Sequence, residues 1–159
     1  MKKTYHKPVM LEEAIQGLKI DPDGVYVDVT FGGGGHSKAI LENLSKHGRL
    51  LAFDQDSAAE QNAIPDERFQ LINGNFSHLK RYLKFNGVTA VDGILADFGV
   101  SSHQFDAGSR GFSTRYDGPL DMRMNPLSAL SAREVVNQYI FDDLAQLFKV
   151  YGELRMAKK

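Results

Sequence analysis

The sequence predicts an α/β protein with a doubly wound parallel sheet, followed by a smaller helical domain. In the first half, segments with a strand pattern alternate with segments with a helix pattern, as in βαβ units. The run Leu50–Phe53 is apolar without a break, which is typical of a strand buried on both faces of a parallel sheet. A glycine-rich turn, Gly32–Gly35, directly follows the first predicted strand, where such sheets bind ligands.

Predicted helices and strands alternate as far as Ala96. The first helix is expected to include Val9, Met10, Ala14 and Leu18, which recur at helical spacing. The predicted strands are Val25–Val29, Leu50–Phe53, Phe69–Ile72 and Gly93–Ala96. The helices between them are expected around Ser37–Leu44, Ser57–Ile64 and Ser77–Phe85, with Gly48 ending the first of the three.

The second half of the chain has a different character. No clear period runs from Phe98 to about Ser128, and so long a stretch without elements is unusual unless it serves a site. Beyond it, Ser131 and Glu134 form a capping box, and Asp142 is expected to cap a final helix. We therefore place one domain at residues 1–108 and a second, helical one at residues 109–159.

The composition fits a globular protein and excludes several protein classes. The chain has 159 residues, a formal net charge of −1, 42% hydrophobic residues and 25% charged residues. This charge excludes nucleic-acid binding by bulk positive charge but leaves room for a local basic groove. The absence of cysteine excludes disulfides and thiolate metal sites. With no signal peptide and no apolar run of about 18 residues, we expect a soluble, cytoplasmic protein that does not engage a membrane.

The glycine turn is the strongest sign of chemistry in the first half. Glycines let the backbone approach a ligand closely, and the helix that follows offers free amides and the positive end of its dipole. Turns of this kind also occur with a packing role alone, and that alternative stays open. The dinucleotide fingerprint needs a third glycine where Ser37 stands, so a dinucleotide-dependent oxidoreductase fits the turn imperfectly.

Polar and aromatic residues follow the predicted strands, at the edge of the sheet where ligands bind. Asp54 ends the second strand about 20 residues after the turn, where an acid commonly binds ribose hydroxyls; capping is the alternative. Asp97 ends the fourth strand and either lines the site or forms a buried salt bridge. Asp28 is expected to brace the turn, and the backbone amide of His36 to face a polar end of the ligand. Phe76 either lies on an adenine ring or belongs to the core.

Several long segments agree with one known family. The segment Asp28–Ser37, which contains the glycine turn, resembles the cofactor motif of bacterial 16S ribosomal RNA (cytosine-N4)-methyltransferases. Further segments resemble the family in the same order: Tyr5–Leu11, Asp92–Ser102, Arg110–Ser113 and, most specific, Asp117–Met124. The chain is identified as a member of this family from Tyr5 to about Ala157. Phe98 and His103 depart from the family's common leucine and proline.

The resemblance implies a Rossmann-like, S-adenosylmethionine-dependent methyltransferase core that is interrupted by an inserted helical domain. Residues 1–108 would form the cofactor-binding part of the core, and residues 109–159 the beginning of the insert. The implied reaction methylates the exocyclic N4 amine of a cytidine in the decoding region of 16S ribosomal RNA, within the small ribosomal subunit. By motif position, the residues that would contact S-adenosylmethionine are Gly34, Gly35, His36, Asp54, Phe76, Asp97 and Gln104.

Family members are longer than this chain, so we expect the remaining core strands to be absent and the strand before Asp97 to form an edge of the sheet. Unpaired edge strands recruit partners, so a homodimer is one possible outcome. A cofactor-binding but inactive fragment of the enzyme is the alternative to an active methyltransferase.

Asp97 is also the predicted catalytic residue. The amine of cytosine is a poor nucleophile, because its lone pair is delocalised into the ring. An acceptor for the amine hydrogen restores electron density on nitrogen, and Asp97 or the carbonyls of Phe98 and Gly99 could serve in this way.

The loop after the first half supplies the candidate substrate contacts. Arg110, Arg115 and Arg123 are candidates for phosphate contacts, and Phe112 and Tyr116 for stacking on bases. Asp117 belongs to the same candidate surface, and Asp106 and Asp121 lie nearby. The alternative is a loop held together by its own Arg–Asp pairs. We predict no required metal, because two loop carboxylates, Asp117 and Asp121, are weak evidence for one.

Overall fold

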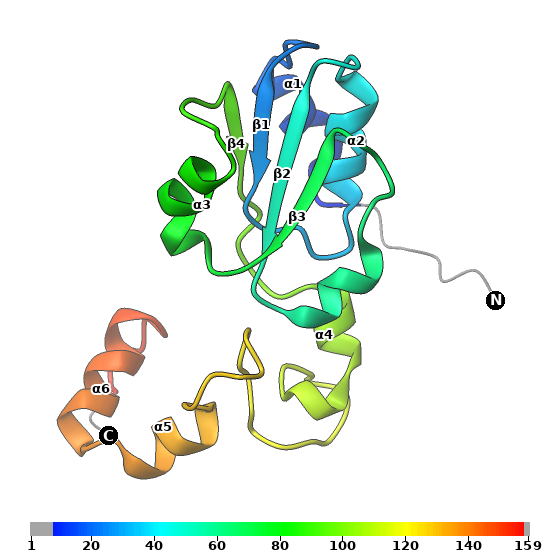
Figure 1. The fold of residues 1–159 in the computed structure, drawn as a ribbon. Helices are drawn as coiled ribbons and strands as arrows, with labels where there is room; N and C mark the ends of the chain where they lie inside the picture. The colour runs from blue at the N-terminus through cyan, green and yellow to red at the C-terminus, as the bar shows by residue number, and fades with distance from the viewer. Residues whose placement is uncertain (1–7, 158–159) are drawn as a thin grey trace. The chain divides into compact units, whose positions relative to one another are not determined.

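The computed structural model describes residues 8–157 (Figure 1). The chain forms two compact units, the first ending at Ser101 and the second beginning at Ser102. The domain boundary expected at residue 108 therefore lies inside the second unit.

The first unit is built on a four-stranded parallel sheet. Its strands are β1 (Val25–Asp28), β2 (Arg49–Asp54), β3 (Phe69–Asn73) and β4 (Gly93–Leu95), in the order β3-β2-β1-β4. Every neighbouring pair is parallel, with Val27 opposite Leu51 and Ile94. The chain adds β2 and β3 on one side of β1 and then crosses to add β4 on the other side. The strand order thus reverses beside β1, which is where sheets of this class bind ligands.

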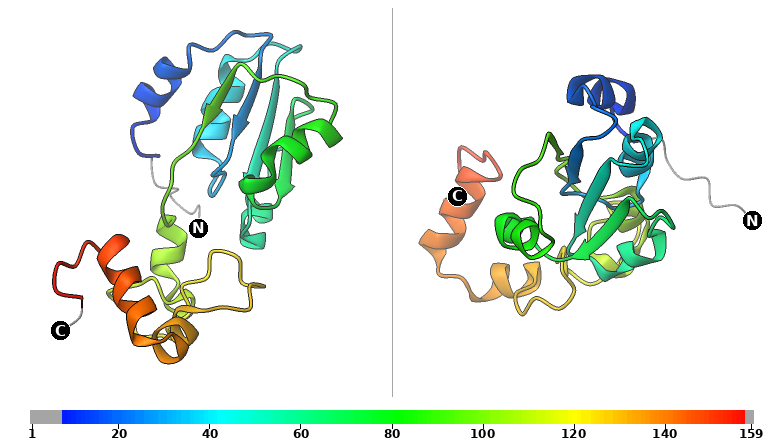
Figure 2. Two further views of the ribbon diagram at one scale, coloured as in Figure 1. Left: turned by 90° about the vertical axis from the view of Figure 1, so that its left-hand side faces the viewer. Right: turned by 45° about the horizontal axis from the view of Figure 1, so that its top comes forward.

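Helices cover both faces of this sheet (Figure 1, Figure 2). On one face, α1 (Leu11–Leu18) and α2 (Gly35–Asn43) pack on Tyr26, Leu50 and Leu95. On the other face, α3 (Leu79–Phe85) packs on Val27, Leu51 and Phe53. Successive strand residues point to opposite faces, so an unbroken apolar run serves both layers. The predicted α/β class with a parallel sheet is confirmed.

The buried run in β2 explains much of the stability of this unit. Leu50, Leu51, Ala52 and Phe53 have no exposed surface. Full burial of a leucine or phenylalanine side chain contributes about 1.5–3 kcal/mol relative to exposure. Three such side chains in one strand therefore hold β2 firmly, and with it the turn and the acid at its carboxyl end.

Several predicted helix limits were wrong. The first helix begins at Leu11, because Met10 has a left-handed backbone (φ 50°) that no α-helix contains, and Val9 is exposed. The next helix, α2, ends at Asn43, so Gly48, which was expected to end it, lies beyond the helix. The segment after β2 forms the 3₁₀ helix η1 (Ser57–Asn62), and the 3₁₀ turn η2 (Phe76–His78) precedes α3.

The second unit consists of short helices and turns. The stretch predicted to lack elements contains α4 (Ser102–Asp106) and the 3₁₀ turn η3 (Gly108–Arg110). After it come α5 (Ala132–Gln138) and α6 (Phe141–Val150). The capping box of Ser131 and Glu134 is confirmed at the start of α5. Ile140 occupies the N-cap of α6, so Asp142 lies in the first helical turn and is not the cap.

Within residues 8–157, no helix combines the length and the apolar character that crossing a membrane requires.

Candidate functional site

The glycine turn joins the carboxyl end of β1 to the start of α2. The Phe31 amide donates to the Phe53 carbonyl (2.9 Å), which ties the turn to β2, and the Gly34 amide donates to the Phe31 carbonyl (2.7 Å). Gly32 and Gly34 have φ angles of +50° and +75°, in the left-handed region that favours glycine. A Cβ atom on Gly34 would also come within 2.9 Å of the Phe31 ring. Backbone conformation and packing both require glycine at position 34.

The start of α2 is in contact with the segment before α1. A Cβ atom on Gly35 would lie 2.2 Å from Cγ of Pro8, so only glycine fits beneath this proline. The His36 ring is buried, with Nε2 3.1 Å from the Val9 carbonyl oxygen. The side chain of His36 is thus used inside the protein. Its backbone amide belongs to the first turn of α2, where amides have no partner within the helix. The predicted segment Tyr5–Leu11 lies partly outside the described residues.

Asp28 braces the turn from below, as predicted. Its carboxylate accepts hydrogen bonds from the Ser37 hydroxyl (2.7 Å) and from the Thr30 amide (3.0 Å). The group has no exposed surface, and burial raises the pKa of Asp28 above its ordinary value despite these hydrogen bonds. Ser37, which broke the dinucleotide fingerprint, therefore has a role of its own as the donor to a buried acid.

Asp54 braces the same turn from the neighbouring strand. Its Oδ2 accepts from the Gly32 amide (2.8 Å), and its Oδ1 accepts from the Asp56 amide (2.9 Å). Sequence reasoning missed this contact, because it depends on how the turn folds over β2. A carboxylate has about four acceptor positions. Two remain on the half-buried Asp54 for ligand hydroxyls, so bracing and ribose binding are compatible.

Phe76 is not a core residue, so that alternative was wrong. Its side chain is 38% exposed, and its ring centroid lies 5.5 Å from that of Phe98, with the rings tilted by 40°. Phe98 is itself 71% exposed. The two rings form an aromatic surface beyond the ends of β3 and β4. The sequence predicted no role for the Phe98 ring, although an aromatic residue at a strand end was an available signal.

Asp97 lies at the same edge, and its predicted buried salt bridge was wrong. The residue is exposed, and in the described part of the chain no ion pair or hydrogen bond engages its carboxylate. Its backbone amide donates to the Thr30 hydroxyl (2.7 Å). The carboxylate is therefore available to a ligand, while the backbone that carries it is fixed to the glycine turn.

The remaining predicted cofactor residue, Gln104, belongs to the second unit. It is buried in α4 and has interactions of its own. In the first unit, Gly34, Gly35 and His36 lie at the start of α2, and Asp54 at the end of β2 is bonded to Gly32 of the same turn.

Intrachain contacts engage the arginines proposed as substrate contacts. Arg110 donates to the Arg123 carbonyl (2.8 Å) and the Met124 carbonyl (3.3 Å). Arg115 forms an exposed ion pair with Asp106 (2.7 Å). Phe112 is half-buried, whereas Tyr116 and Asp117 are exposed.

A second ion pair fixes the loop further along. Arg123 contacts Asp121 at 2.6 Å, and these hydrogen bonds lower the pKa of Asp121 to about 2. The alternative of a loop held by its own Arg–Asp pairs is thus confirmed for two pairs. Within residues 8–157, no group of three or more His, Asp or Glu side chains could hold a metal ion.

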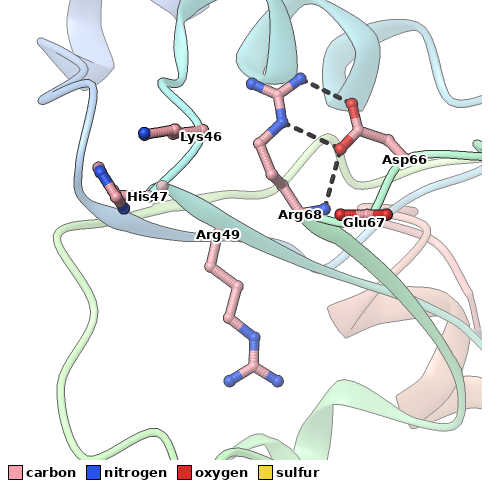
Figure 3. Close-up of a pocket in the computed structure, with 7 residues that line it drawn as sticks. Lys46, His47, Arg49, Asp66, Glu67 and Arg68 are labelled. Atoms are coloured by element: carbon pink, nitrogen blue, oxygen red, sulfur yellow. Dashed lines mark hydrogen bonds and ion pairs between the residues drawn. The ribbon is translucent and has the colours of Figure 1, made fainter.

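A hollow at the opposite, amino edge of the sheet has a different chemistry. It measures about 560 Å³ and is lined by Lys46, His47, Gly48, Arg49, Asp66, Glu67 and Arg68. Figure 3 shows the Arg68 guanidinium turned onto Asp66, at 2.6 Å. Arg49 donates to the side chain of Gln70 and the carbonyl of Asn86. Arg68 is thus paired with Asp66 and Arg49 is held by neutral groups, whereas the glycine turn and the strand-end acids lie at the carboxyl edge, which remains the candidate site.

The parallel sheet, the glycine turn after β1 and the acid that ends β2 together define an α/β protein of the Rossmann-like class. Within that class, the chain belongs to the MraW methylase family, because the sequence model of that family matches residues 3–159. The family predicted from the sequence is confirmed. The alternative function, that of a dinucleotide-dependent oxidoreductase, finds no support in this family match.

Curated relatives are similar over almost the whole chain. Ribosomal RNA small subunit methyltransferase H of Flavobacterium johnsoniae is 61% identical over 96% of this chain and 51% of its own length. Proteins of the same name from Christiangramia forsetii and Bacteroides thetaiotaomicron are 59% and 53% identical, each over 98% of this chain and 51% of their own length. The chain spans about half the length of these relatives.

Proposed function

We propose that the chain binds S-adenosylmethionine at the carboxyl edge of its first unit. The proposed reaction methylates the N4 amine of a cytidine in the decoding region of 16S ribosomal RNA, in the small ribosomal subunit. The observation that carries the proposal is an intact, doubly braced glycine turn, held by Asp28 and Asp54, in a chain about 60% identical to ribosomal RNA small subunit methyltransferases.

The residues at the glycine turn fit such a cofactor. Amides in the first turn of α2, at Gly35 and His36, suit an anionic carboxylate. The two open acceptor positions on Asp54 suit the ribose hydroxyls. The exposed ring of Phe76 suits an adenine face. Gln104 of the second unit is proposed as a further contact from motif position alone.

When bound, the cofactor supplies an electrophilic methyl group on a sulfonium. The residues of the chain must orient the acceptor amine within about 3–3.5 Å of that methyl group. The Asp97 carboxylate, exposed and without a partner among the described residues, would accept a hydrogen from the amine. This contact raises electron density on nitrogen and provides a place for the proton that nitrogen loses. The target base must be unpaired or extruded to reach this edge.

The second unit is proposed to begin the inserted helical domain and to contact RNA. Among its arginines, Arg115 is the better phosphate ligand. An exposed pair such as Arg115–Asp106 is worth only about 0–1 kcal/mol, so phosphate can replace Asp106. Arg110 holds two backbone carbonyls and is more costly to redirect. Phe112 and Asp117 remain proposed contacts.

A second candidate is a chain that binds the cofactor without turnover. Two observations favour it: the chain spans about half of its relatives, and β4 lies at an edge of the sheet with Ile94 49% exposed. An incomplete acceptor surface would leave the glycine turn intact and abolish transfer. A homodimer has no support in either the fold or the relatives.

Two measurements on the same preparation test the proposal. Calorimetric titration should give binding of S-adenosylmethionine and none of NAD. Transfer of a labelled methyl group to small-subunit RNA and to isolated subunits should then be compared with the full-length Flavobacterium johnsoniae relative. Binding without transfer would support the inactive chain, and absence of binding would contradict both candidates.

A further inference from the structure

The solvent face of α3 carries a cluster of basic side chains. Helical geometry places Leu79, Tyr82 and Leu83 against the core of the first unit. The opposite face presents three cations, Lys80, Arg81 and Lys84, and the preceding 3₁₀ turn adds His78. We call these four exposed residues the α3 basic surface.

No acidic side chain balances this surface locally. The chain contains 20 acidic residues, yet none lies between Arg68 and Val91. Among the described residues, no ion pair or side-chain hydrogen bond engages Lys80, Arg81 or Lys84. Lys80 and Lys84 are also one helical turn apart, where like charges destabilise a helix. The stability of the fold therefore does not explain this cluster of cations, whereas binding of an anionic partner would explain it.

The α3 basic surface belongs to the same unit as the candidate site. Strand β3 ends at Asn73 on the carboxyl edge, and η2, which contains Phe76, leads directly into α3. A chain of anions that passes Phe76 would next meet Lys80 and Arg81. Phe85, 88% exposed at the end of the helix, adds an aromatic ring without a packing role.

We propose that the α3 basic surface binds the phosphate backbone of the RNA substrate, with Phe85 stacking on an unpaired base. This inference rests on the proposed function. Clustered cations without an acidic neighbour in the sequence suit a polyanion and carry no base specificity. An exposed aromatic ring beside them suits single-stranded RNA, since every base offers a face for stacking.

The test compares two double charge reversals that change net charge equally. Lys80→Glu/Lys84→Glu alters the proposed surface. Lys19→Glu/Lys46→Glu is the matched control, because both lysines are exposed and precede the amino ends of β1 and β2. The probe is a labelled decoding-region transcript, titrated by anisotropy over a series of KCl concentrations. Affinity for S-adenosylmethionine reports whether each variant is folded.

The α3 variant should bind the transcript about tenfold more weakly or worse near 0.1 M salt, and the slope of log K against log salt should fall by about 1–2. The control should retain the wild-type slope, and both variants should bind the cofactor. Phe85→Ala should weaken binding to unpaired RNA about fivefold or more with the slope unchanged.

Equal losses in the two double variants would overturn the inference, because bulk charge would then explain them. Unchanged affinity in the α3 variant would also overturn it, as would Lys80- and Lys84-dependent binding to phosphatidylglycerol vesicles with RNA binding intact. Unchanged RNA binding by Phe85→Ala would overturn the stacking role. If the wild type neither binds nor methylates RNA, the proposed function fails and the inference fails with it. If the wild type methylates RNA and the α3 variant binds RNA as well as the wild type does, the inference is contradicted while the proposed function stands.

Discussion

The hydroxyl of Thr30 accepts a hydrogen bond from the backbone amide of Asp97 at 2.7 Å, across 67 residues of sequence. The same hydroxyl lies 3.4 Å from Oδ1 of Asp28. Its hydrogen can thus face the buried carboxylate while a lone pair faces the Asp97 amide. The glycine turn and the segment that carries the proposed catalytic acid are therefore positioned by one side chain.

Removal of the Thr30 hydroxyl should misplace Asp97 without unfolding the protein. Thr30→Val keeps the shape but loses a hydrogen bond worth about 0.5–1.5 kcal/mol, so the methyl-transfer rate should fall about two- to tenfold. Thr30→Ser should restore the rate, because it keeps the acceptor. Single-turnover rates and calorimetric cofactor affinities separate positioning from binding. A rate for Thr30→Val equal to that of the wild type would show that the contact does not position Asp97.

Asp97 itself should affect turnover more than binding. Asp97→Ala removes the proposed acceptor for the amine hydrogen, and loss of such a group costs about a hundredfold or more in rate. The dissociation constant for S-adenosylmethionine should change little, with Asp97→Asn intermediate in rate. Equal losses of affinity in both variants, with no separate rate defect, would assign Asp97 to cofactor binding alone.

The strands were predicted almost to the residue, whereas the helix limits were not. Continuous apolar runs such as Leu50–Phe53 mark strands buried on both faces, and the structure buries all four residues. Helical spacing counts side chains and is insensitive to φ, so it included Val9 and Met10 despite the left-handed backbone of Met10. Local sequence therefore predicts the sheet better than the points where helices begin.

The site was predictable only where its contacts are local or follow strand ends. The support that Asp28 gives to Thr30, two residues away, followed from position. The support that Asp54 gives to Gly32 did not, because it requires β2 to pair beside β1. The contact between Phe76 and Phe98 likewise depends on two separate strand ends lying at one edge. Such contacts arise from topology, which residue types alone do not determine.

The two roles of Asp54 predict a joint loss of stability and binding. Asp54→Ala removes the acceptor of the Gly32 and Asp56 amides and should lower the free energy of unfolding by about 2 kcal/mol. The same change removes the proposed ribose contact. Glu42→Ala, an exposed acid on α2, is the matched control and should stay within about 0.5 kcal/mol of wild type. Urea denaturation and calorimetry test both effects. Weaker cofactor binding by Asp54→Ala at unchanged stability would contradict the bracing role.

The raised pKa of Asp28 predicts a pH dependence of folding. The unfolded chain releases this proton near pH 3.8, whereas the buried carboxyl in the folded state retains it to higher pH. Between the pKa of the unfolded chain and the higher pKa of the folded state, the folded state binds more protons. The free energy of unfolding should therefore fall as pH rises through this interval. Asp28→Asn can still accept from Thr30 and donate to Ser37, and should remove this slope. Urea midpoints from about pH 4 to 8 measure it. Parallel pH profiles for wild type and variant would show that Asp28 does not titrate in this range.

Two glycines should respond oppositely to the same substitution. Gly35→Ala would place Cβ 2.2 Å from Cγ of Pro8, so either the segment before α1 or the start of α2 must move. Gly17, in α1, has no atom within 4 Å of its Cβ position, and alanine there should stabilise the helix by about 0.5–1 kcal/mol. Gly35→Ala should instead lower the midpoint of thermal unfolding and weaken S-adenosylmethionine binding, because the amides of Gly35 and His36 shift. Calorimetry on both variants gives the comparison. Stabilisation by Gly35→Ala would mean that Pro8 does not rest on this glycine in solution.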